Sequence, residues 1–476
     1  MPPMNERTIA ARLATWVADL DFDQIPRVAV DSAKQLILDQ VGLQINGSQL
    51  PNIRPELALI DDLNAIPQST VVGTGVRTNA AYAAFANGTL AGSSEFDDVH
   101  MFAAHIGSHV VPPAIAFAER DGSTGRDVIT AVVAGAQVMS ILGSVSVAKM
   151  VGRGWHGSKI LGTFGAAATT AKLLGLDADH IEQALGIAGS DAGGGMEYEF
   201  SGGEVKRMHS GSAARLGAQA AILAQNGLTG PATIIEGKRG LFHLFADDSV
   251  NVADIESQWS RYHIIDTIFR MYPTIGSAAT VLEGVNQIVQ KKAFRWQDIK
   301  EIRVGLPAIA VGHGAATTHP SDAVSAQFST AFGIALMLVH GSNTPADYMN
   351  STLWTDDNIS SVIDRVVPYG KDFAPDMSLL SAQIDIELNN GSILTHLQRG
   401  FRGHPDNPGL AEAVEEKFRG IVDGIIPSAN IDRLVALVNQ LEGESDMSEL
   451  LALTLKPAFR PHDKHNGEDH GSPARP

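Results

Sequence analysis

The chain has 476 residues, of which 53 are acidic and 35 basic, so its formal net charge is −18 at pH 7. A negative protein is a poor partner for nucleic acid or for an anionic membrane surface. It contains no cysteine, which excludes disulfides, thiolate nucleophiles, and iron–sulfur or cysteine-ligated zinc sites built from its own side chains. The length exceeds what one hydrophobic core usually supports, so two domains are expected.

The two ends of the chain carry no strong targeting signal. Residues 1–20 lack a basic start followed by an apolar core and a cleavage site, so we expect no signal peptide. No uninterrupted apolar run reaches about 18 residues, and a cytoplasmic location is the simplest expectation. Residues 458–476 are polar and rich in Gly and Pro, so a disordered tail is predicted there, with its histidines solvated rather than bound to metal.

Helical periodicity dominates the first half of the sequence. Apolar residues recur at helical spacing from Ile9 to Leu20, and Pro26 ends that segment. The same pattern predicts helices over 29–45, 79–91, 110–120, 126–149, 159–174, 179–188 and 209–227. Gly and Ala fill so many positions between Gly154 and Pro231 that these helices are expected to pack closely in the core.

The pattern changes after residue 265. Ile302, Val304 and Leu306 alternate with polar residues, and a second alternating run ends at Asn389–Gly391 before a third begins, which is typical of a β-hairpin. Helical sequence resumes over 409–455. We therefore predict an all-α helical domain formed by residues 1–265 and 401–457, with a smaller α+β domain, residues 266–400, inserted into it.

Basic and titratable side chains gather in four segments. Removing a weakly acidic α-proton beside a carboxylate needs a nearby base and cations that stabilise the developing charge. The residues that suit these tasks are His105, His156, Lys206, Arg207, His209 and Arg270. Lys206 and Arg207 stand at an expected helix start, where the helix dipole disfavours positive charge unless an anion lies nearby. This favours an anion-binding role.

Several motifs resemble those of the MmgE/PrpD family, which includes 2-methylcitrate dehydratases, cis-aconitate decarboxylases and iminodisuccinate epimerases. They are AAYAAFANGTLAGSSEFDDVH from residue 80, GWHG from residue 154, KRMHSG from residue 206, RMYPTIGSA from residue 270 and GHPDNPGL from residue 403. The resemblance runs from about Ala10 to about Leu455 in the family's order. It implies a helical domain with a smaller lid domain, a homodimer and a small carboxylate substrate.

The resemblance also implies roles for individual residues. The catalytic residues it implies are His105, His156, Lys206 and Asp97, and the substrate-binding residues are Glu95, Asp98, Arg207, His209, Arg270 and Tyr272. His105 and His156 are predicted to transfer protons, since histidine titrates near neutrality, while Lys206 and Arg270 bind substrate carboxylate. The structural alternatives are that Asp97 or Asp98 caps the next helix and that His105 and His109 are ordinary buried histidines.

Four polar positions depart from the family pattern. Glu95 stands where Asp is usual, and three positions are apolar: Val99 for Thr, Ile275 for His and Val311 for the Tyr of decarboxylases. Fewer polar groups suggest a smaller, less charged or partly apolar substrate than a tricarboxylate. Arg270 replaces Lys but keeps the charge and suits one carboxylate.

The predicted function is a metal-independent lyase, a dehydratase or decarboxylase, that acts on a small di- or tricarboxylate by α-proton abstraction. An epimerase of an amino- or imino-dicarboxylate and a non-catalytic metabolite-binding protein are the alternatives. No cofactor or metal is predicted, because there is no HExxH motif and the residues between His105 and His109 supply no carboxylate base. The Gly73-x-Gly75 sequence lacks the third glycine of a dinucleotide site.

Overall fold

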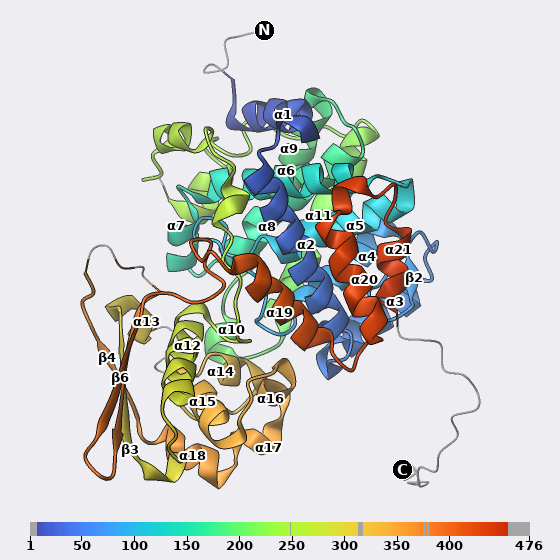
Figure 1. The fold of residues 1–476 in the computed structure, drawn as a ribbon. Coiled ribbons are helices and arrows are strands. Elements are labelled where there is room, and N and C mark those ends of the chain that lie inside the picture. Colours follow the sequence, from blue (N-terminus) through green and yellow to red (C-terminus); the bar gives the residue numbers. More distant parts are fainter. Residues whose placement is uncertain (1–6, 248, 313–317, 375–376, 378–379, 456–476) are drawn as a thin grey trace, which may run out of the picture.

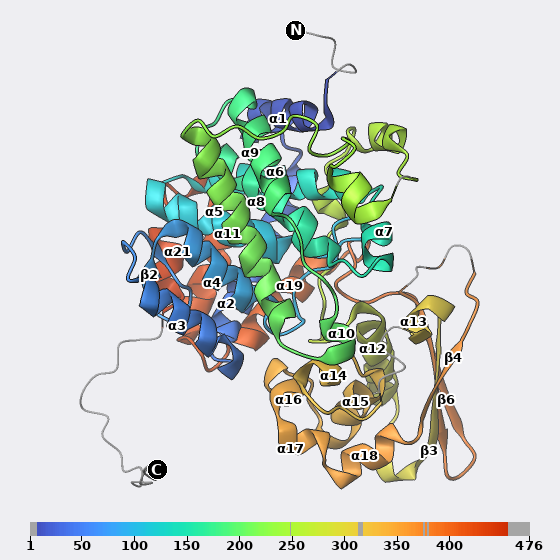
Figure 2. The ribbon, with the colours of Figure 1, turned by 180° about the vertical axis from the view of Figure 1, so that it is seen from behind.

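The computed structural model describes residues 7–247, 249–312, 318–374, 377 and 380–455. A large helical body and a smaller body with a sheet at its outer side lie next to each other (Figure 1). Seen from behind, α11 (Val205–Gln225) runs through the helical body towards the smaller one (Figure 2). The predicted tail at 458–476 lies outside the described residues.

The helical body contains most of the predicted helices, with ends shifted by a few residues. Its other helices are α1 (Ile9–Asp19), α2 (Arg27–Gly47), α3 (Arg54–Leu63), α4 (Ala80–Gly92), α5 (Gly107–Asp121), α6 (Gly125–Gly143), α7 (Val147–Gly152), α8 (Gly157–Leu173), α9 (Ala178–Asp191), α10 (Tyr198–Ser201), α19 (Leu410–Val422), α20 (Ser428–Asn439) and α21 (Ser448–Leu453). The Gly73–Gly75 segment connects two short strands, β1 (Ser69–Thr70) and β2 (Arg77–Thr78).

One helix prediction needs correction. The segment predicted as a single helix over 126–149 is divided into α6 and α7. The hydroxyls of Ser144 and Ser146 donate to the carbonyls of Ile141 and Leu142, both at 2.7 Å, and thereby compete with backbone N–H groups at the end of α6. Among the described helices, α6 is long and apolar enough to cross a membrane, but 89% of that window is buried inside the protein, as in a core helix.

Small residues let the central helices approach closely, as predicted. A Cβ built on Gly211 of α11 would lie 2.1 Å from the carbonyl oxygen of Phe85 in α4. On the same helix, a Cβ on Gly217 would lie 2.5 Å from the backbone nitrogen of Ala167 in α8. Helix α11 is therefore held between α4 and α8 at backbone contact, and this fixes the position of its first turn.

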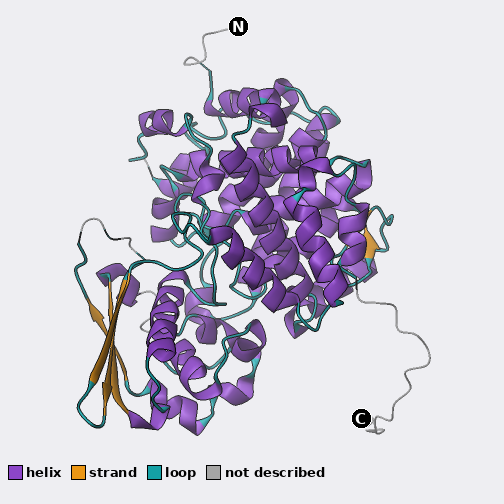
Figure 3. Cartoon of the chain, viewed as in Figure 1, coloured by secondary structure: helices purple, strands orange, loops and turns teal. Residues whose placement is uncertain are grey.

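The smaller body is built on a four-stranded mixed sheet of order β4-β3-β5-β6. Its strands are β3 (Ile299–Leu306), β4 (Val366–Gly370), β5 (Ala382–Leu388) and β6 (Ile393–Gln398), shown in orange in Figure 3. β3 pairs parallel with β4 and antiparallel with β5. The predicted hairpin at Asn389–Gly391 connects β5 to β6, with Gly391 at φ +83°.

Helices cover the inner face of this sheet. Helix α12 (Gly276–Lys291) packs on β5 and β6, and Gly284 lets it approach Ile384. The remaining helices of the smaller body are α13 (Ala308–Gly312), α14 (Ala323–Gln327), α15 (Thr330–Ala335), α16 (Pro345–Met349), α17 (Ser351–Trp354) and α18 (Asp357–Ile363).

Each body has one large hydrophobic core, and the helical body also contains two smaller clusters, around Phe117 and around Phe85. The larger core draws on residues from Ile9 to Phe269 and from Val414 to Leu451, and the smaller on residues from Tyr272 to Leu394. The predicted fold class, a helical domain with a smaller α+β domain, is confirmed. The predicted boundaries at 265/266 and 400/401 stay predictions.

Candidate active site

Five segments meet where the two bodies touch. The loop between α4 and α5 lies against residues 268–270, because Val99 and Ile268 exchange backbone hydrogen bonds of 2.7 and 2.8 Å. His156, immediately before α8, and Lys206, in the first turn of α11, lie near enough for the lysine charge to act on the imidazole. From the smaller body, the side chain of Gln327 donates to the carbonyl of Ser94 at 2.7 Å. The site thus depends on both bodies.

Glu95 stands at the centre of a buried ionic cluster. Its carboxylate contacts the ammonium of Lys206 and accepts a hydrogen bond of 3.0 Å from Nη1 of Arg270. Burial alone would raise the pKa of Glu95, but the two cations outweigh it and hold that pKa well below its usual range. Glu95 also has φ +52°, a conformation that non-glycine residues adopt mainly where surrounding contacts impose it.

Arg270 is enclosed by protein acceptors. Its guanidinium contacts the carboxylate of Asp97, and its Nε donates to the Asp97 carbonyl at 2.6 Å. Nη1 also lies 3.3 Å from the carbonyl of Thr274. With Glu95, these contacts use most of its N–H groups, so the geometry favours Arg270 as the residue that holds Glu95 and Asp97 in place. Direct substrate binding by Arg270 stays a prediction.

His105 is placed as a proton acceptor. Its Nδ1 lies 2.6 Å from the carbonyl oxygen of Asp98 and 3.5 Å from a carboxylate oxygen of Asp97. Because a carbonyl can only accept a hydrogen bond, Nδ1 carries the proton in the neutral ring and Nε2 is a bare base. Burial lowers the pKa of His105, and Asp97 opposes that shift. Asp97 also accepts a hydrogen bond of 3.0 Å from the hydroxyl of Ser108.

Asp98 points away from this base and towards α5. Its two carboxylate oxygens accept the backbone N–H groups of Ile106 and Gly107, both at 2.8 Å, at the start of α5. Burial and the neighbouring Asp97 raise the pKa of Asp98 to about 7. This geometry favours the capping alternative for Asp98, whereas Asp97 contacts His105.

His156 and His209 form a second pair. Their Nδ1 atoms lie 2.8 Å apart, and the ring of Tyr198 makes edge contacts with both. The backbone N–H of His156 donates to the carbonyl of Gly194 at 2.9 Å, which fixes the start of α8. Burial lowers the pKa of both rings, that of His209 to about 4.

Protein carboxylates lie beside Lys206 and Arg207, where the sequence predicts an anion. Both residues lie in the first turn of α11, as the sequence indicates. Glu95 neutralises Lys206, and Glu204 lies 3.3 Å from Arg207. Protein carboxylates therefore already offset the charge that the helix dipole disfavours, and an anion-binding role for Lys206 and Arg207 towards substrate stays a prediction. On the side of the smaller body, the Phe328 ring lies 4.9 Å from the Lys206 ammonium.

Tyr272 belongs to different surroundings. It packs in the smaller core, and burial together with Glu283 raises its pKa. Its other charged neighbours are Arg402 and Glu416, and neither belongs to the Glu95 cluster. The structure therefore separates Tyr272 from the histidines with which the sequence groups it, and its role in substrate binding stays a prediction.

Lys159 is a candidate that sequence reasoning missed. It lies in the first turn of α8, three residues after His156, and makes no ion pair within the part of the chain that the structure describes. It lies near His209 and contributes to the lowered pKa of that ring. A Cβ built on Gly194 would lie 3.5 Å from its ammonium. The spacing from His156 on one helix is the signal that could have found it.

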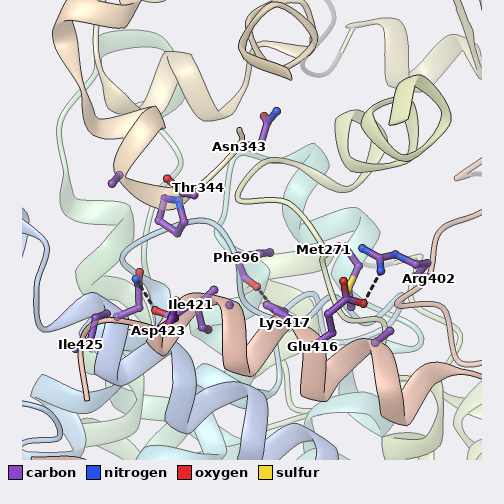
Figure 4. Close-up of a pocket in the computed structure, with 15 residues that line it drawn as sticks. Phe96, Met271, Asn343, Thr344, Arg402, Glu416, Lys417, Ile421, Asp423 and Ile425 are labelled. Atoms are coloured by element: carbon purple, nitrogen blue, oxygen red, sulfur yellow. Dashed lines mark hydrogen bonds and ion pairs between the residues drawn. The ribbon is translucent and has the colours of Figure 1, made fainter. Parts of the chain in front are cut away.

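A cavity of about 370 Å³ lies between α19 and the smaller body (Figure 4). Phe96, Thr344 and Lys417 are among its lining residues, and the Lys417 ammonium donates to the Phe96 carbonyl at 2.6 Å. Lys417 also forms a buried ion pair of 2.6 Å with Asp39. None of the predicted site residues lines this cavity, so it lies beside the histidine cluster rather than within it.

One group of described residues has the spacing of metal ligands: His100, His263 and Asp266. Nδ1 of His100 accepts the backbone N–H groups of Phe102 and Ala103, both at 3.2 Å. Its Nε2 then donates to the carbonyl of His263 at 3.1 Å. Since both nitrogens of His100 are used in this way, the arrangement does not favour a metal here.

Comparison with known proteins agrees with this architecture. Residues 11–252 match the MmgE/PrpD N-terminal domain and residues 272–442 the MmgE/PrpD C-terminal domain. The cis-aconitate decarboxylase-like protein oryM of Aspergillus oryzae is 29% identical, over 94% of this chain and 97% of that protein. The cis-aconitate decarboxylase of Homo sapiens is 27% identical over 96% of each chain, and that of Aspergillus terreus is 26% identical over 95% and 97%. The chain therefore belongs to the MmgE/PrpD family.

Proposed function

We propose that this protein is a lyase that acts on a small carboxylic acid, with His105 as the base. The observation that carries this proposal is the hydrogen bond from Nδ1 of His105 to the Asp98 carbonyl, which leaves Nε2 as a proton acceptor. Asp97 stabilises the imidazolium that forms when His105 takes a proton. His156 belongs to the second proton-transfer pair, and the relatives named above, decarboxylases in name, support lyase chemistry.

Decarboxylation and dehydration make different demands on the site. Decarboxylation replaces a carbon–carboxylate bond by a carbon–hydrogen bond, so it releases carbon dioxide and consumes one proton. Dehydration removes an α-proton and protonates a leaving hydroxyl, so it needs a base and an acid together. We favour decarboxylation, because the relatives carry that name. In that reaction His105 first takes up a proton, the Asp97 carboxylate stabilises the imidazolium, and His105 then gives this proton to the product carbon.

The charges in the cluster favour a dicarboxylate over a tricarboxylate. Lys206 and Arg270 are balanced by Glu95 and Asp97, so these four side chains sum to zero charge. A substrate with three carboxylates would bring three further charges into a buried site. We propose that Lys159 supplies the additional cation for a smaller, less charged acid.

An epimerase is the alternative that a specific observation supports. His105 precedes α5, whereas His156 and His209 come from α8 and α11. Two proton-transfer groups from separate elements suit removal of a proton from one face of a carbon and its return to the other. A non-catalytic metabolite-binding protein is the second alternative.

Incubation in deuterated water with candidate acids separates these functions. The panel contains cis-aconitate, hydroxy-dicarboxylates and amino-dicarboxylates, and the products are followed by NMR and mass spectrometry. Carbon dioxide release with one deuterium bonded to a carbon of the remaining acid identifies a decarboxylase, and alkene formation with loss of water identifies a dehydratase. Exchange with an intact skeleton identifies an epimerase. Binding without any exchange would contradict the enzymatic proposal.

We further propose that the reaction needs no metal and takes place in the cytoplasm. Treatment with a chelator should leave the turnover rate unchanged, since the proposed base and acid are histidines. Loss of activity that a divalent ion restores would contradict metal independence. As a control, the same ion is added to protein that was not treated with the chelator. Full activity there shows that the ion itself does not inhibit the enzyme.

A further inference from the structure

The imidazole rings of His156 and His209 are joined by a hydrogen bond between their Nδ1 atoms. A role in substrate binding does not explain this bond. Their Nδ1 atoms face each other at 2.8 Å, and the ring centroids lie 5.0 Å apart. The two rings come from the start of α8 and the first turns of α11, held by separate contacts. Both side chains are buried. A distance of 2.8 Å between two nitrogens is a short hydrogen bond.

This distance fixes the number of protons between the rings. Two bare Nδ1 atoms would direct lone pairs at each other, and two protonated ones would direct hydrogens at each other. The contact therefore holds one proton. A neutral imidazole has one N–H, so the two rings are opposite tautomers: the ring that donates through Nδ1 has a bare Nε2, and its partner has a protonated Nε2.

The surroundings keep the pair neutral. The charged groups that lower the pKa of these rings are Lys206, which acts on both, and Lys159, which acts on His209. His105 and His109 further disfavour a charged His156. The ring of Tyr198 covers both imidazoles. Burial is the largest cause of the lowered pKa of both rings, and together with these neighbours it denies the pair the stabilisation that a second proton would need.

We propose that His156 and His209 form a proton relay of the active site, an inference that rests on the proposed lyase function. A proton that reaches Nε2 of His156 is matched by transfer of the Nδ1 proton from His156 to His209. Water then accepts the Nε2 proton of His209. One N–H bond forms and one breaks at each ring, so the pair ends with the same number of protons and exchanged tautomers. Transfer in the opposite direction restores the starting state.

This relay changes the role of His209. The sequence groups His209 with the substrate-binding residues, whereas its Nδ1 is occupied by His156. His209 acts through His156 and is a positioning residue. It also decides whether Nε2 of His156 accepts or donates a proton, since the two nitrogens of one ring are linked by the tautomer.

The proton count can be tested without any substrate. In protein labelled with 15N-histidine, we expect one exchangeable imidazole proton at pH 7 that shows scalar coupling to Nδ1 of both His156 and His209. Single His156→Asn and His209→Asn variants assign the two rings. His263→Asn, which removes another buried histidine, is the control and should leave the coupled signal in place. Two uncoupled rings, or a doubly protonated pair, would overturn the proposal.

Proton transfer through the pair is tested by kinetics. The amide of His209→Asn can still hydrogen-bond to Nδ1 of His156, but it cannot pass a proton on. We expect kcat to fall by about 10- to 100-fold with KM little changed, because general acid–base catalysis contributes on this order. An unchanged kcat, or a change confined to KM, would refute the relay. If no substrate in the panel reacts, the lyase proposal fails, and the NMR measurement still decides the pairing.

Discussion

At the scale of single residues, the site is organised around Glu95. Its carboxylate holds Lys206 and Arg270, and Arg270 in turn holds Asp97 against His105. Lys206 and Arg270 are thus each paired with protein carboxylates. We therefore assign proton transfer to the histidines of the site. Lys206 and Arg270 hold the carboxylates of Glu95 and Asp97 in place.

This division of roles predicts different kinetic effects. Lys206→Ala should raise KM with a smaller effect on kcat, because it leaves the Glu95 carboxylate without this cation, and the uncompensated negative charge disfavours a carboxylate substrate. His105→Ala or His156→Gln should lower kcat by about 100-fold or more, because each removes a proton-transfer group. Steady-state kinetics and circular dichroism would measure activity and folding.

Lys300→Ala is a matched control for the lysine variant, since Lys300 pairs with Glu387 at the protein surface. Both kinetic constants should stay at their wild-type values. If Lys206→Ala instead abolished proton exchange while both histidine variants stayed active, lysine would be the base. A two-base epimerase with Lys206 on one face of the carbon would then be favoured.

At the scale of secondary structure elements, close helix packing sets the position of the site. Lys206 and His209 lie at the start of α11, and glycines further along that helix allow contact with the backbones of α4 and α8. A larger side chain in these contacts would displace the helix, because packed interiors accommodate extra atoms poorly.

Two glycine substitutions test this dependence. Gly211→Ala places a Cβ 2.1 Å from the Phe85 carbonyl, so the free energy of unfolding should fall by about 1–3 kcal/mol. Gly420→Ala is the matched control in α19, where a Cβ has no neighbour within 4 Å, and it should stabilise the protein by about 0.5–1 kcal/mol. Urea unfolding gives both values. Equal destabilisation by the two variants would contradict the close-packing interpretation.

At the scale of the whole molecule, buried neutral histidines connect stability to pH. Burial lowers the pKa of His100 and His109 to about 3 and that of His209 to about 4. In the unfolded chain each titrates near about 6.5. Between pH 6.5 and about 4 the unfolded state therefore binds more protons, so stability rises with pH in this window and is lost on acidification. Asp98 opposes this trend, because its raised pKa means that the folded protein holds one proton there which the unfolded chain has already lost.

We expect the urea midpoint to fall as the pH is lowered from 7 to 5. His100→Asn should reduce the slope of unfolding free energy against pH by up to the equivalent of one proton. The variant lacks one histidine that is neutral in the folded protein and takes up a proton when the chain unfolds. His180→Asn, at a side chain that is 45% exposed, is the control and should keep the wild-type slope. An unchanged slope in His100→Asn would show that this ring takes up its proton in the folded state.

The association state is a second prediction at this scale. The small-residue faces of α4, α8 and α11 bury one another within one chain, so they do not by themselves require a partner. The prediction of a homodimer therefore rests on the family. Light scattering at micromolar concentration should give twice the mass of 50.4 kDa. A single-chain mass at that concentration would contradict it.

The sequence by itself determined the helical first half, the Asn389–Gly391 hairpin and the family, because periodicity, turn residues and motifs are local properties of the chain. It also named most residues of the cluster, including His105, His156 and Lys206. Only the tertiary structure decided their partners. Glu95 neutralises Lys206, Asp98 caps α5, and His209 meets His156, since such contacts join residues that are far apart in the chain. Whether a charged side chain binds substrate or another side chain depends on which opposite charge the fold brings to it, and a local pattern does not contain that information.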